Sequence, residues 1–220
     1  MLRVRNWRDL GGLPSRSAPL EVKRRSFFRS STPARFAPPE QTALASLKLR
    51  CVVDLRTQAE VVQSCSVAAT CGARLLHIPL FDAARPNWLA PADQTPQATG
   101  ARYFEMLQDG LEALRVTVTE VAQADNRPFL VACTAGRDRT GIVVACLLDL
   151  LDVTDEAIAA DYAASDPFDP DTGRAHAGTM LELLGLVRDS YGSVARMLQS
   201  DGLAEGVVES LRSQLLVPRM

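Results

Sequence analysis

The sequence predicts an α/β fold: a single domain with a central, mostly parallel sheet flanked by helices and a helical C-terminal part. Its 220 residues are 47% hydrophobic and 23% charged, which is a globular composition. Short apolar runs alternate with longer segments of helical periodicity, as in layered α/β proteins. Loops at residues 83–100 and 165–173 are too short to link domains, so we assign residues 1–220 to one domain.

Three β-rich runs are the candidate strands of the sheet. Residues 51–55 follow a helical stretch at residues 39–49, and residues 75–80 and 128–133 form the second and third runs. Between these two runs, residues 103–122 carry apolar side chains at helical spacing. A strand, a helix and a strand in this order predict parallel pairing with a right-handed crossover.

The C-terminal third is predicted to be helical. Residues 141–151 are so apolar that we expect a buried helix directly after the loop of the third strand. Further helices are expected at residues 154–164, 178–191, 194–198 and 204–216. The tail is therefore interpreted as all helix.

Cysteine content and hydropathy limit the class of protein. The five cysteines are an odd number without metal-finger spacing, so we expect neither a disulfide framework nor a metal site. No stretch approaches the ~18 apolar residues of a spanning helix, and the first residues lack the apolar core of a secretory signal. We expect a cytoplasmic protein with no stable membrane anchor.

Charge is unevenly distributed along the chain. Residues 1–50 hold 11 Lys and Arg against 3 Asp and Glu, a net +8, whereas the other residues sum to −10. The basic segment could border a site for anionic substrates, bind nucleic acid, or pair with the acidic remainder. Aromatic residues make up 5% and no nucleic-acid fingerprint occurs, so we expect no nucleic-acid partner.

The segment VACTAGRDRTG, residues 131–141, carries the strongest chemical signal. Cys133 and Arg139 are separated by five residues in a glycine-containing loop between an apolar strand and an apolar helix. Such a loop can turn its amides inward, and the helix N-terminus favours a bound dianion and a thiolate. Arg139 can grip two phosphate oxygens, and Thr140 can donate a hydrogen bond to the sulfur.

These features predict a phosphate cradle with Cys133 as nucleophile. A bound phosphate or sulfate ion is expected there. The alternative is a buried cysteine at a strand end with an unrelated surface arginine. The predicted cradle consists of Cys133, Thr134, Ala135, Gly136, Arg137, Asp138 and Arg139.

Cys-x5-Arg followed by Thr resembles the signature of the cysteine-based protein tyrosine phosphatase superfamily. The run GRDRTG at 136–141 is similar to the GKDRTG of the bacterial tyrosine and lipid phosphatase family. Further similarity lies in NWRDLGG (6–12), FRSS (28–31), VDLR (53–56), DYAAS (161–165) and YGS (191–193).

The resemblance covers almost the whole chain. It implies a cysteine phosphatase fold, and a protein tyrosine phosphatase that hydrolyses phosphate monoesters through a phosphocysteine without metal or cofactor. Its expected partner is a phosphorylated protein or a phosphoinositide substrate.

Two positions depart from the resembled family. Ala132 stands where the family has a His before the nucleophile. The resemblance implies that this His organises the loop, so its loss leaves the degree of Cys133 activation open. Arg137 replaces a Lys and keeps the positive charge on a wider, planar group.

Two aspartates are candidates for the general acid that protonates the leaving group. Asp82 follows the second predicted strand, on the same side of a parallel sheet as the Cys133 loop. Asp138 lies inside the loop, where the resembled family also has Asp. We favour Asp82 and keep Asp138 as the alternative.

Other polar residues are interpreted as structural. We expect a buried ion pair in the turn at Arg8 and Asp9, and structural roles for Asp54 and Arg56 at a strand end. His77 and His176 have no second ligand at metal-site spacing, so we expect ordinary histidines.

Two other functions remain as alternatives to the phosphatase. A rhodanese-type sulfurtransferase also uses a loop cysteine between a strand and a helix. A catalytically weak phosphate-binding module would fit the missing His at position 132. Among phosphatase substrates we expect phosphotyrosine first, phosphoinositides second and phosphoserine last, since Thr134 is neutral where dedicated inositide phosphatases have Lys.

Overall fold

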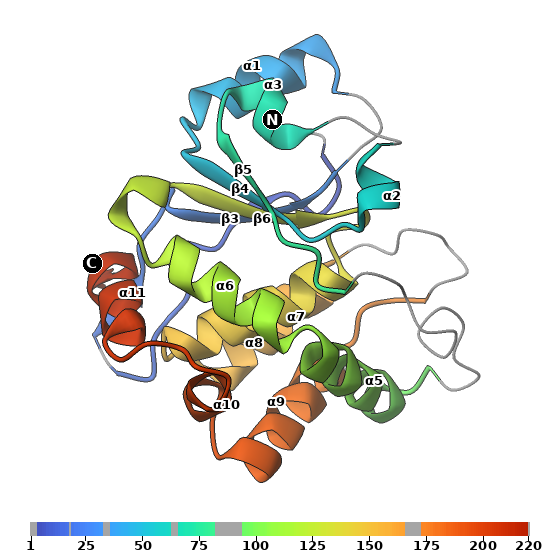
Figure 1. Cartoon of the computed structure of the whole chain (residues 1–220), viewed down its shortest axis with the longest axis vertical. Helices are drawn as coiled ribbons and strands as arrows, with labels where there is room; N and C mark the ends of the chain where they lie inside the picture. The colour runs from blue at the N-terminus through green and yellow to red at the C-terminus, as the bar shows by residue number, and fades with distance from the viewer. Residues whose placement is uncertain are drawn as a thin grey trace.

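A five-stranded sheet forms the centre of the molecule (Figure 1). The computed structural model describes residues 4–17, 19–32, 36–62, 66–81, 94–165 and 173–219. The strand order is β1-β3-β6-β4-β5, in which β1 runs antiparallel to β3 and the other pairs are parallel. The strands are β1 (Arg8–Asp9), β3 (Phe27–Ser31), β4 (Cys51–Asp54), β5 (Arg74–His77) and β6 (Phe129–Cys133). This mostly parallel α/β sheet confirms the predicted fold class.

Helices cover both faces of the sheet. Figure 1 shows α1 and α3 on one face and the larger helical layer on the other. Every residue of β4 and β6 is buried, which explains why these strands are nearly continuous apolar runs in the sequence. The helices are α1 (Pro38–Ser46), α2 (Gln58–Val61), α3 (Val67–Cys71), α5 (Pro96–Asp109), α6 (Leu111–Val121), α7 (Asp138–Leu150), α8 (Asp155–Ala163), α9 (Ala177–Tyr191), α10 (Val194–Ser200) and α11 (Val207–Leu215), with a short 3-10 turn at Ala124–Asn126.

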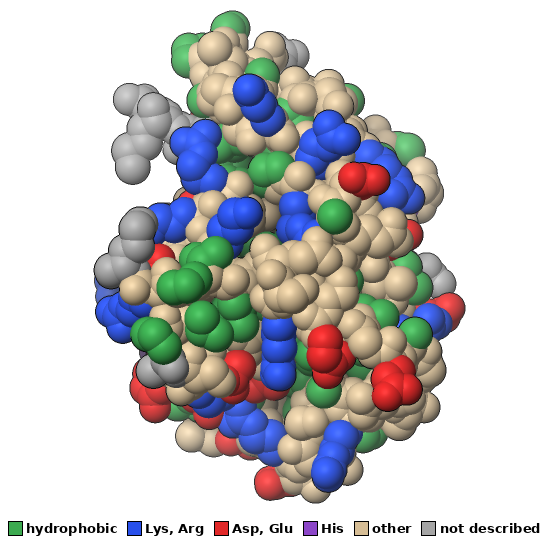
Figure 2. Space-filling view, turned by 90° about the vertical axis from the view of Figure 1, so that its left-hand side faces the viewer, with side chains coloured by type: hydrophobic (Ala, Val, Ile, Leu, Met, Phe, Trp, Pro, Cys, Tyr) green, Lys and Arg blue, Asp and Glu red, His purple; other side chains and the backbone are tan. Residues whose placement is uncertain are grey.

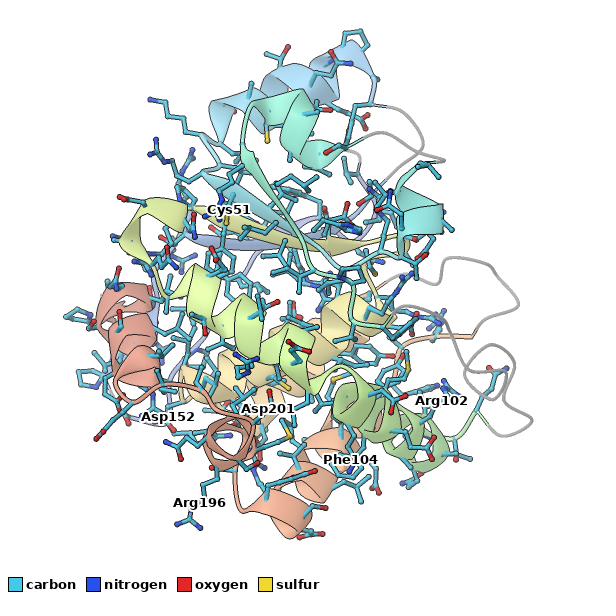
Figure 3. The ribbon with its side chains drawn as sticks, viewed as in Figure 1. Cys51, Arg102, Phe104, Asp152, Arg196 and Asp201 are labelled. Carbon is cyan, nitrogen blue, oxygen red and sulfur yellow. The ribbon has the colours of Figure 1, made fainter. Side chains whose placement is uncertain are left out.

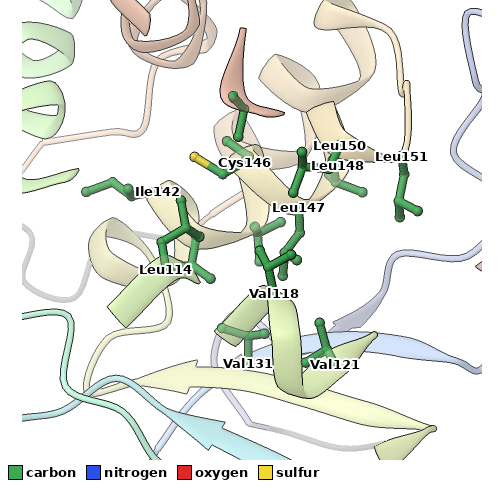
Figure 4. Packing of buried hydrophobic residues seen from close by; sticks show 14 of the residues in the cluster. Leu114, Val118, Val121, Val131, Ile142, Cys146, Leu147, Leu148, Leu150 and Leu151 are labelled. Carbon is green, nitrogen blue, oxygen red and sulfur yellow. The ribbon is translucent and has the colours of Figure 1, made fainter. Parts of the chain in front are cut away.

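Helix α7 is the central helix of the larger layer. Figure 4 shows its apolar side chains packed against Leu114, Val118 and Val121 of α6, above Val131 of β6. Ten of its residues are buried, so the predicted buried helix is confirmed. It begins at Asp138 rather than at residue 141, because the charged residues of the loop already form its first turn. This packing fixes the end of β6 and the start of α7 in space.

The connection between the second and third predicted strands differs from the expectation in two ways. β4 lies between β5 and β6, so these two strands are parallel but are not neighbours. The single predicted helix at 103–122 is two helices that meet at Gly110. A Cβ atom at Gly110 would come within 2.4 Å of the Leu80 carbonyl oxygen, so the close approach of these segments requires glycine.

Several short elements were not predicted. β3, α2 and α3 are absent from the sequence interpretation, and α5 begins inside the segment that was expected to be a loop. The tail is not entirely helical, because β7 (Leu216–Pro218) pairs antiparallel with β2 (Leu20–Val22) in a separate two-stranded sheet. Edge pairings of three residues carry too little hydrophobic periodicity to be recognised.

The surface mixes charges of both signs. Figure 2 shows Lys and Arg side chains spread singly over the upper part of one face, with more Asp and Glu toward the lower part. Within the described ranges, no helix has the length and apolar character needed to cross a membrane.

Candidate active site

The predicted loop lies at the carboxyl end of the parallel strands. Cys133 is the last residue of β6 and is 2% exposed. β6 pairs with β3 on one side, where Ser31 is opposite Cys133, and with β4 on the other, where Asp54 is opposite Ala132. Because these strands end together, the segments that follow them surround the loop.

Gly136 brings the loop against β3 and onto the sulfur. Its φ of +68° lies in the left-handed region. A Cβ atom there would approach the Ser31 nitrogen to 2.3 Å, so a side chain has no room. The Gly136 amide donates a hydrogen bond to Cys133 Sγ at 3.2 Å. This loop amide therefore points inward, at the sulfur.

Arg139 lies in the first turn of α7 and binds Glu60 of α2. Its Nη1 and Nη2 donate to the two Glu60 carboxylate oxygens at 2.6 and 2.7 Å. Thr134 Oγ1 donates to the same carboxylate. Although burial opposes it, these bonds hold the pKa of Glu60 well below its usual range. Glu60 thus orients both Arg139 and the start of the loop.

Glu60 was missed by the sequence interpretation. The sequence signal for Glu60 is a capping box at the start of α2. Thr57 Oγ1 accepts a hydrogen bond from the Glu60 amide at 3.4 Å, and the Glu60 carboxylate accepts one from the Thr57 amide at 2.9 Å. A capping box predicts where a helix starts, but it does not indicate that the Glu60 carboxylate binds Arg139.

Asp138 is held by two donors at the rim of the loop. Its Oδ1 accepts hydrogen bonds from Tyr103 OH and from Arg137 Nε, the latter at 3.1 Å. Burial raises the pKa of Tyr103 well above 10, so this hydroxyl stays protonated and donates. Tyr103 also meets the Tyr162 hydroxyl at 2.9 Å. The second guanidinium arm of Arg137 donates to the Gly173 carbonyl at 3.0 Å.

One predicted site residue does not make its expected contact in the site. Thr140 is fully buried, and its hydroxyl has no hydrogen-bond partner among the described residues, so the expected bond to the Cys133 sulfur is not formed. The Gly136 amide donates a hydrogen bond to that sulfur instead. Asp82 lies outside the described residues.

The other described cysteines are poor nucleophiles. Burial raises the pKa of Cys51 to about 12 and also raises the pKa values of Cys71 and Cys146. Cys51 begins β4 and lies at the opposite end of the sheet from the loop (Figure 3). Cys65 is outside the described residues. Across the described ranges, no three His, Cys, Asp or Glu side chains gather in a group that could hold a metal ion.

The residues interpreted as structural are part of local networks. Asp54 and Arg56 form a buried ion pair with two bonds at 2.6 and 2.9 Å, and the Arg56 carbonyl lies 2.8 Å from His77 Nε2. The expected pairing of Arg8 with Asp9 is wrong, because Arg8 turns to Asp161 of α8. Asp9 instead accepts two backbone amides near the strand end.

Basic side chains of the N-terminal segment pair with acidic residues of the C-terminal part. Arg8 and Arg29 both bind Asp161, and Arg16 lies within ion-pair distance of Asp149, Asp152 and Asp155. Pairing within the fold, one of the three interpretations of the charge asymmetry, therefore accounts for these three arginines.

Comparison with known proteins identifies the family. A model described as the tyrosine phosphatase family matches residues 1–217. A tyrosine-protein phosphatase of Nostoc commune is 26% identical over 217 residues, covering 86% of this chain and 74% of the relative. The triple specificity protein phosphatase PtpB of Mycobacterium tuberculosis is 28% identical over 148 residues, and the match spans about half of that protein, 52%.

A solved structure shares the fold. The core catalytic domain of the PP-IP phosphatase SIW14 from S. cerevisiae superposes with a TM-score of 0.51, covering 93% of this chain and 98% of that chain at 16% identity. The family match favours the phosphatase over the sulfurtransferase alternative and agrees with a cysteine-and-arginine loop between β6 and α7. This chain belongs to the tyrosine phosphatase family.

Proposed function

We propose that this protein hydrolyses phosphate monoesters, phosphotyrosine foremost, through a phosphocysteine at Cys133. The observation that carries the proposal is the Gly136 amide directed at Cys133 Sγ at 3.2 Å, at the N-terminus of α7. Arg139 follows in the first helical turn with its guanidinium already oriented by Glu60. A thiolate, inward amides and a planar cation together suit an attack on a bound phosphate dianion.

The reaction proceeds in two displacements at phosphorus. The Cys133 thiolate forms the S–P bond while the P–O bond to the alcohol breaks, and a carboxylic acid gives its proton to the departing oxygen. Water then forms a new O–P bond as the S–P bond breaks. The same carboxylate accepts the proton of that water, and inorganic phosphate leaves. Loop amides and Arg139 balance the negative charge of both transition states.

Asp138 and Asp82 remain the two candidates for the acid. Support for Asp138 comes from its place in the loop, where Tyr103 and Arg137 fix the position of its Oδ1. The expectation for Asp82 rests on its place after the second predicted strand.

The leaving group separates the two assignments. Replacing the true acid by Asn slows phosphotyrosine hydrolysis by roughly 10² or more, and esters of very acidic phenols less, because good leaving groups need no proton. Asp138→Asn and Asp82→Asn should be compared on the same ester pair. Equal losses on both esters would exclude the variant residue as the acid.

Phosphotyrosine is proposed ahead of phosphoinositides because Arg137 is already engaged. Its Nε and Nη1 bind Asp138 and the Gly173 carbonyl, and its side chain is 12% exposed. A second phosphate could use the Arg137 cation only by replacing these contacts, which weakens phosphoinositide binding but still makes it depend on Arg137. The name of the relative PtpB, a triple specificity phosphatase, supports a secondary activity on other phosphate esters. Arg137→Ala should reduce phosphoinositide turnover more than phosphotyrosine turnover; an equal effect would contradict this ranking.

The decisive experiment is Cys133→Ser assayed with phosphotyrosine, phosphoserine and phosphoinositide substrates. We expect hydrolysis to vanish while phosphate affinity stays within about tenfold, because loop amides and Arg139 do most of the binding. Turnover above about a hundredth of wild type would exclude Cys133 as nucleophile. Thiosulfate turnover by the wild type would favour the sulfurtransferase, and no turnover of any ester would favour the binding module.

A further inference from the structure

A buried arginine binds backbone carbonyls of the loop. Arg29 of β3 is 0% exposed, and its Nη2 donates to the Gly136 carbonyl at 2.8 Å and more weakly to the Arg137 carbonyl at 3.4 Å. Its Nη1 binds the carboxylate of Asp161, which is itself buried and also bound by Arg8. Residues more than a hundred positions apart in the chain thus meet beneath the loop.

The direction of these carbonyls determines the direction of the amides. In a trans peptide the C=O and the N–H point to opposite sides. Asn6 Nδ2 holds the Ala135 carbonyl at 2.9 Å, and the amide of that same peptide, Gly136 N–H, points at Cys133 Sγ. By the same geometry, Arg29 holds the Gly136 carbonyl outward and turns the Arg137 N–H into the cradle.

Arg29 is on the same face of the sheet as the nucleophile. Side chains alternate along β3 and β6, and Phe27, Val131 and Cys133 belong to one apolar cluster while Phe28 and Ala132 belong to the other. Arg29 is opposite Val131 in the register. Position 132 therefore faces away from the loop, and its alanine packs in the apolar cluster on the other face of the sheet.

Stability alone explains this pair poorly. Desolvation lowers the pKa of Arg29, and its Nε has no hydrogen-bond partner in the described part of the chain. A buried ion pair with an unsatisfied donor is often no more stable than apolar residues of similar volume. The Arg29–Asp161 pair instead fixes the orientation of the Gly136 carbonyl.

We propose that Arg29, held in place by Asp161, is a positioning residue that keeps the Gly136 carbonyl outward so that the loop amides form the oxyanion cradle. This inference rests on the proposed function of the loop. A guanidinium is needed because its planar fork reaches the carboxylate and the carbonyl together, whereas an ammonium reaches one of them at a time. The charged and titratable groups that interact electrostatically with Arg29 are Asp161, Arg8, Cys133 and Tyr162.

The test measures oxyanion affinity in the full-length protein. Arg29→Met should raise the inhibition constant of vanadate at least about tenfold, the equivalent of one charge-assisted hydrogen bond, and reduce kcat/KM by a similar or larger factor. Arg29→Lys should fall between Met and wild type, about threefold to tenfold weaker than wild type, because one of the two contacts survives. Urea unfolding at the assay temperature verifies that each variant is folded.

Arg212→Met is the matched control. Arg212 Nε donates to the Leu150 carbonyl at 2.6 Å, so it is also an arginine bound to a backbone carbonyl, but at the C-terminal end of α7 instead of in the loop before that helix. We expect this variant to lose stability while the vanadate constant stays within about twofold of wild type. The inference is overturned if folded Arg29→Met matches Arg212→Met in vanadate affinity. If Arg29→Met does not fold, an unchanged vanadate constant in Arg29→Lys overturns it.

A binding measurement separates this inference from the proposed function. Inorganic phosphate is titrated into Cys133→Ser and into Cys133→Ser combined with Arg29→Met, so that no catalysis is required. Weaker binding in the double variant supports the positioning role even if Cys133→Ser were to retain activity. Equal phosphate affinity in the two proteins overturns it even if Cys133 is the nucleophile.

Discussion

Replacing Glu60 by Gln removes the charge that orients Arg139 and leaves a side chain of the same shape. Both carboxylate oxygens bind Arg139, at 2.6 and 2.7 Å, and Thr134 donates to the same group. The oxygen of a Gln side chain can still accept one hydrogen bond from Arg139. Its amide nitrogen is a donor, however, and would face the second N–H donor of Arg139 with no acceptor between them. The substitution therefore perturbs stability and the orientation of the phosphate-binding cation together.

The stability effect is expected to depend on pH. Charge-assisted hydrogen bonds contribute roughly 1.5–3 kcal/mol each, which we reduce to about 1–2 kcal/mol for the pair because the Glu60 side chain is 32% exposed. The pKa of Glu60 is lowered in the folded state, so its contribution is present above its unfolded pKa of about 4.3 and is lost as the pH falls. At pH 3 up to about 1.8 kcal/mol is lost, which is comparable to the difference in stability between the two proteins.

Urea unfolding of wild type and Glu60→Gln from pH 3 to pH 7 measures this difference. Activity is measured in parallel at pH 6–7, where kcat/KM for an aryl phosphate should fall about tenfold because the Arg139 fork loses its fixed orientation. Glu112→Gln is the control, since that carboxylate is 82% exposed and lies 3.7 Å from its partner Arg115. A stability difference that is constant across the pH range would refute the assigned contact. Unchanged kcat/KM would refute the orienting role.

Three further predictions test the surroundings of the loop. Gly136→Ala should abolish aryl phosphate hydrolysis, because the new Cβ would lie 2.3 Å from the Ser31 nitrogen at a positive φ; activity above about a tenth of wild type would contradict this. Arg56→Met should lower the free energy of unfolding by about 3–5 kcal/mol, because it leaves the buried Asp54 unpaired; a loss below about 1 kcal/mol in urea unfolding would contradict this. EDTA should leave the hydrolysis rate unchanged; loss of rate that a divalent ion restores would mean that metal chemistry is required.

The sequence was sufficient for the elements that form the centre of the fold. β4 and β6 are entirely buried, and ten residues of α7 are buried. Each therefore appears in the sequence as an apolar run, and the length of the run distinguishes the strands from the helix. Cys133 and Arg139 were found because the chemistry of the loop needs both within one short segment between two such runs. Local patterns of this kind are independent of the rest of the chain.

Elements that depend on distant partners could not be predicted in the same way. β3 is entirely buried but reads Phe-Phe-Arg-Ser-Ser, which matches no buried strand pattern, because Arg29 at its centre binds the Gly136 carbonyl of the loop. Asp161, which binds Arg29, lies 132 positions away on α8. No spacing in the sequence indicates that these two residues form an ion pair. Glu60 lies on a four-residue helix, which is too short for periodicity to identify a face.

Some buried polar atoms beside the loop have no hydrogen-bond partner among the described residues. Arg29 Nε, Ser30 Oγ, Thr32 Oγ1 and Thr140 Oγ1 lie in or next to β3 or in the first turn of α7, while Arg102 Nε, Arg102 Nη1 and Thr117 Oγ1 lie on α5 and α6. Each such atom costs about 1–3 kcal/mol of stability. The apolar packing of α7 against α6 and β6 supplies the opposing free energy.

Such costs are tolerated where a fold must place polar groups around a reactive centre. β3 contributes Arg29, which donates to the carbonyl of Gly136, and the amide of Gly136 donates to the Cys133 sulfur. Replacing Arg29 by an apolar residue would satisfy the packing rules but would leave Gly136 without the donor that fixes its carbonyl. The mismatch between sequence rules and structure at β3 is therefore best explained by the requirements of the loop, which is why the strand was missed and why Arg29 is the residue to test.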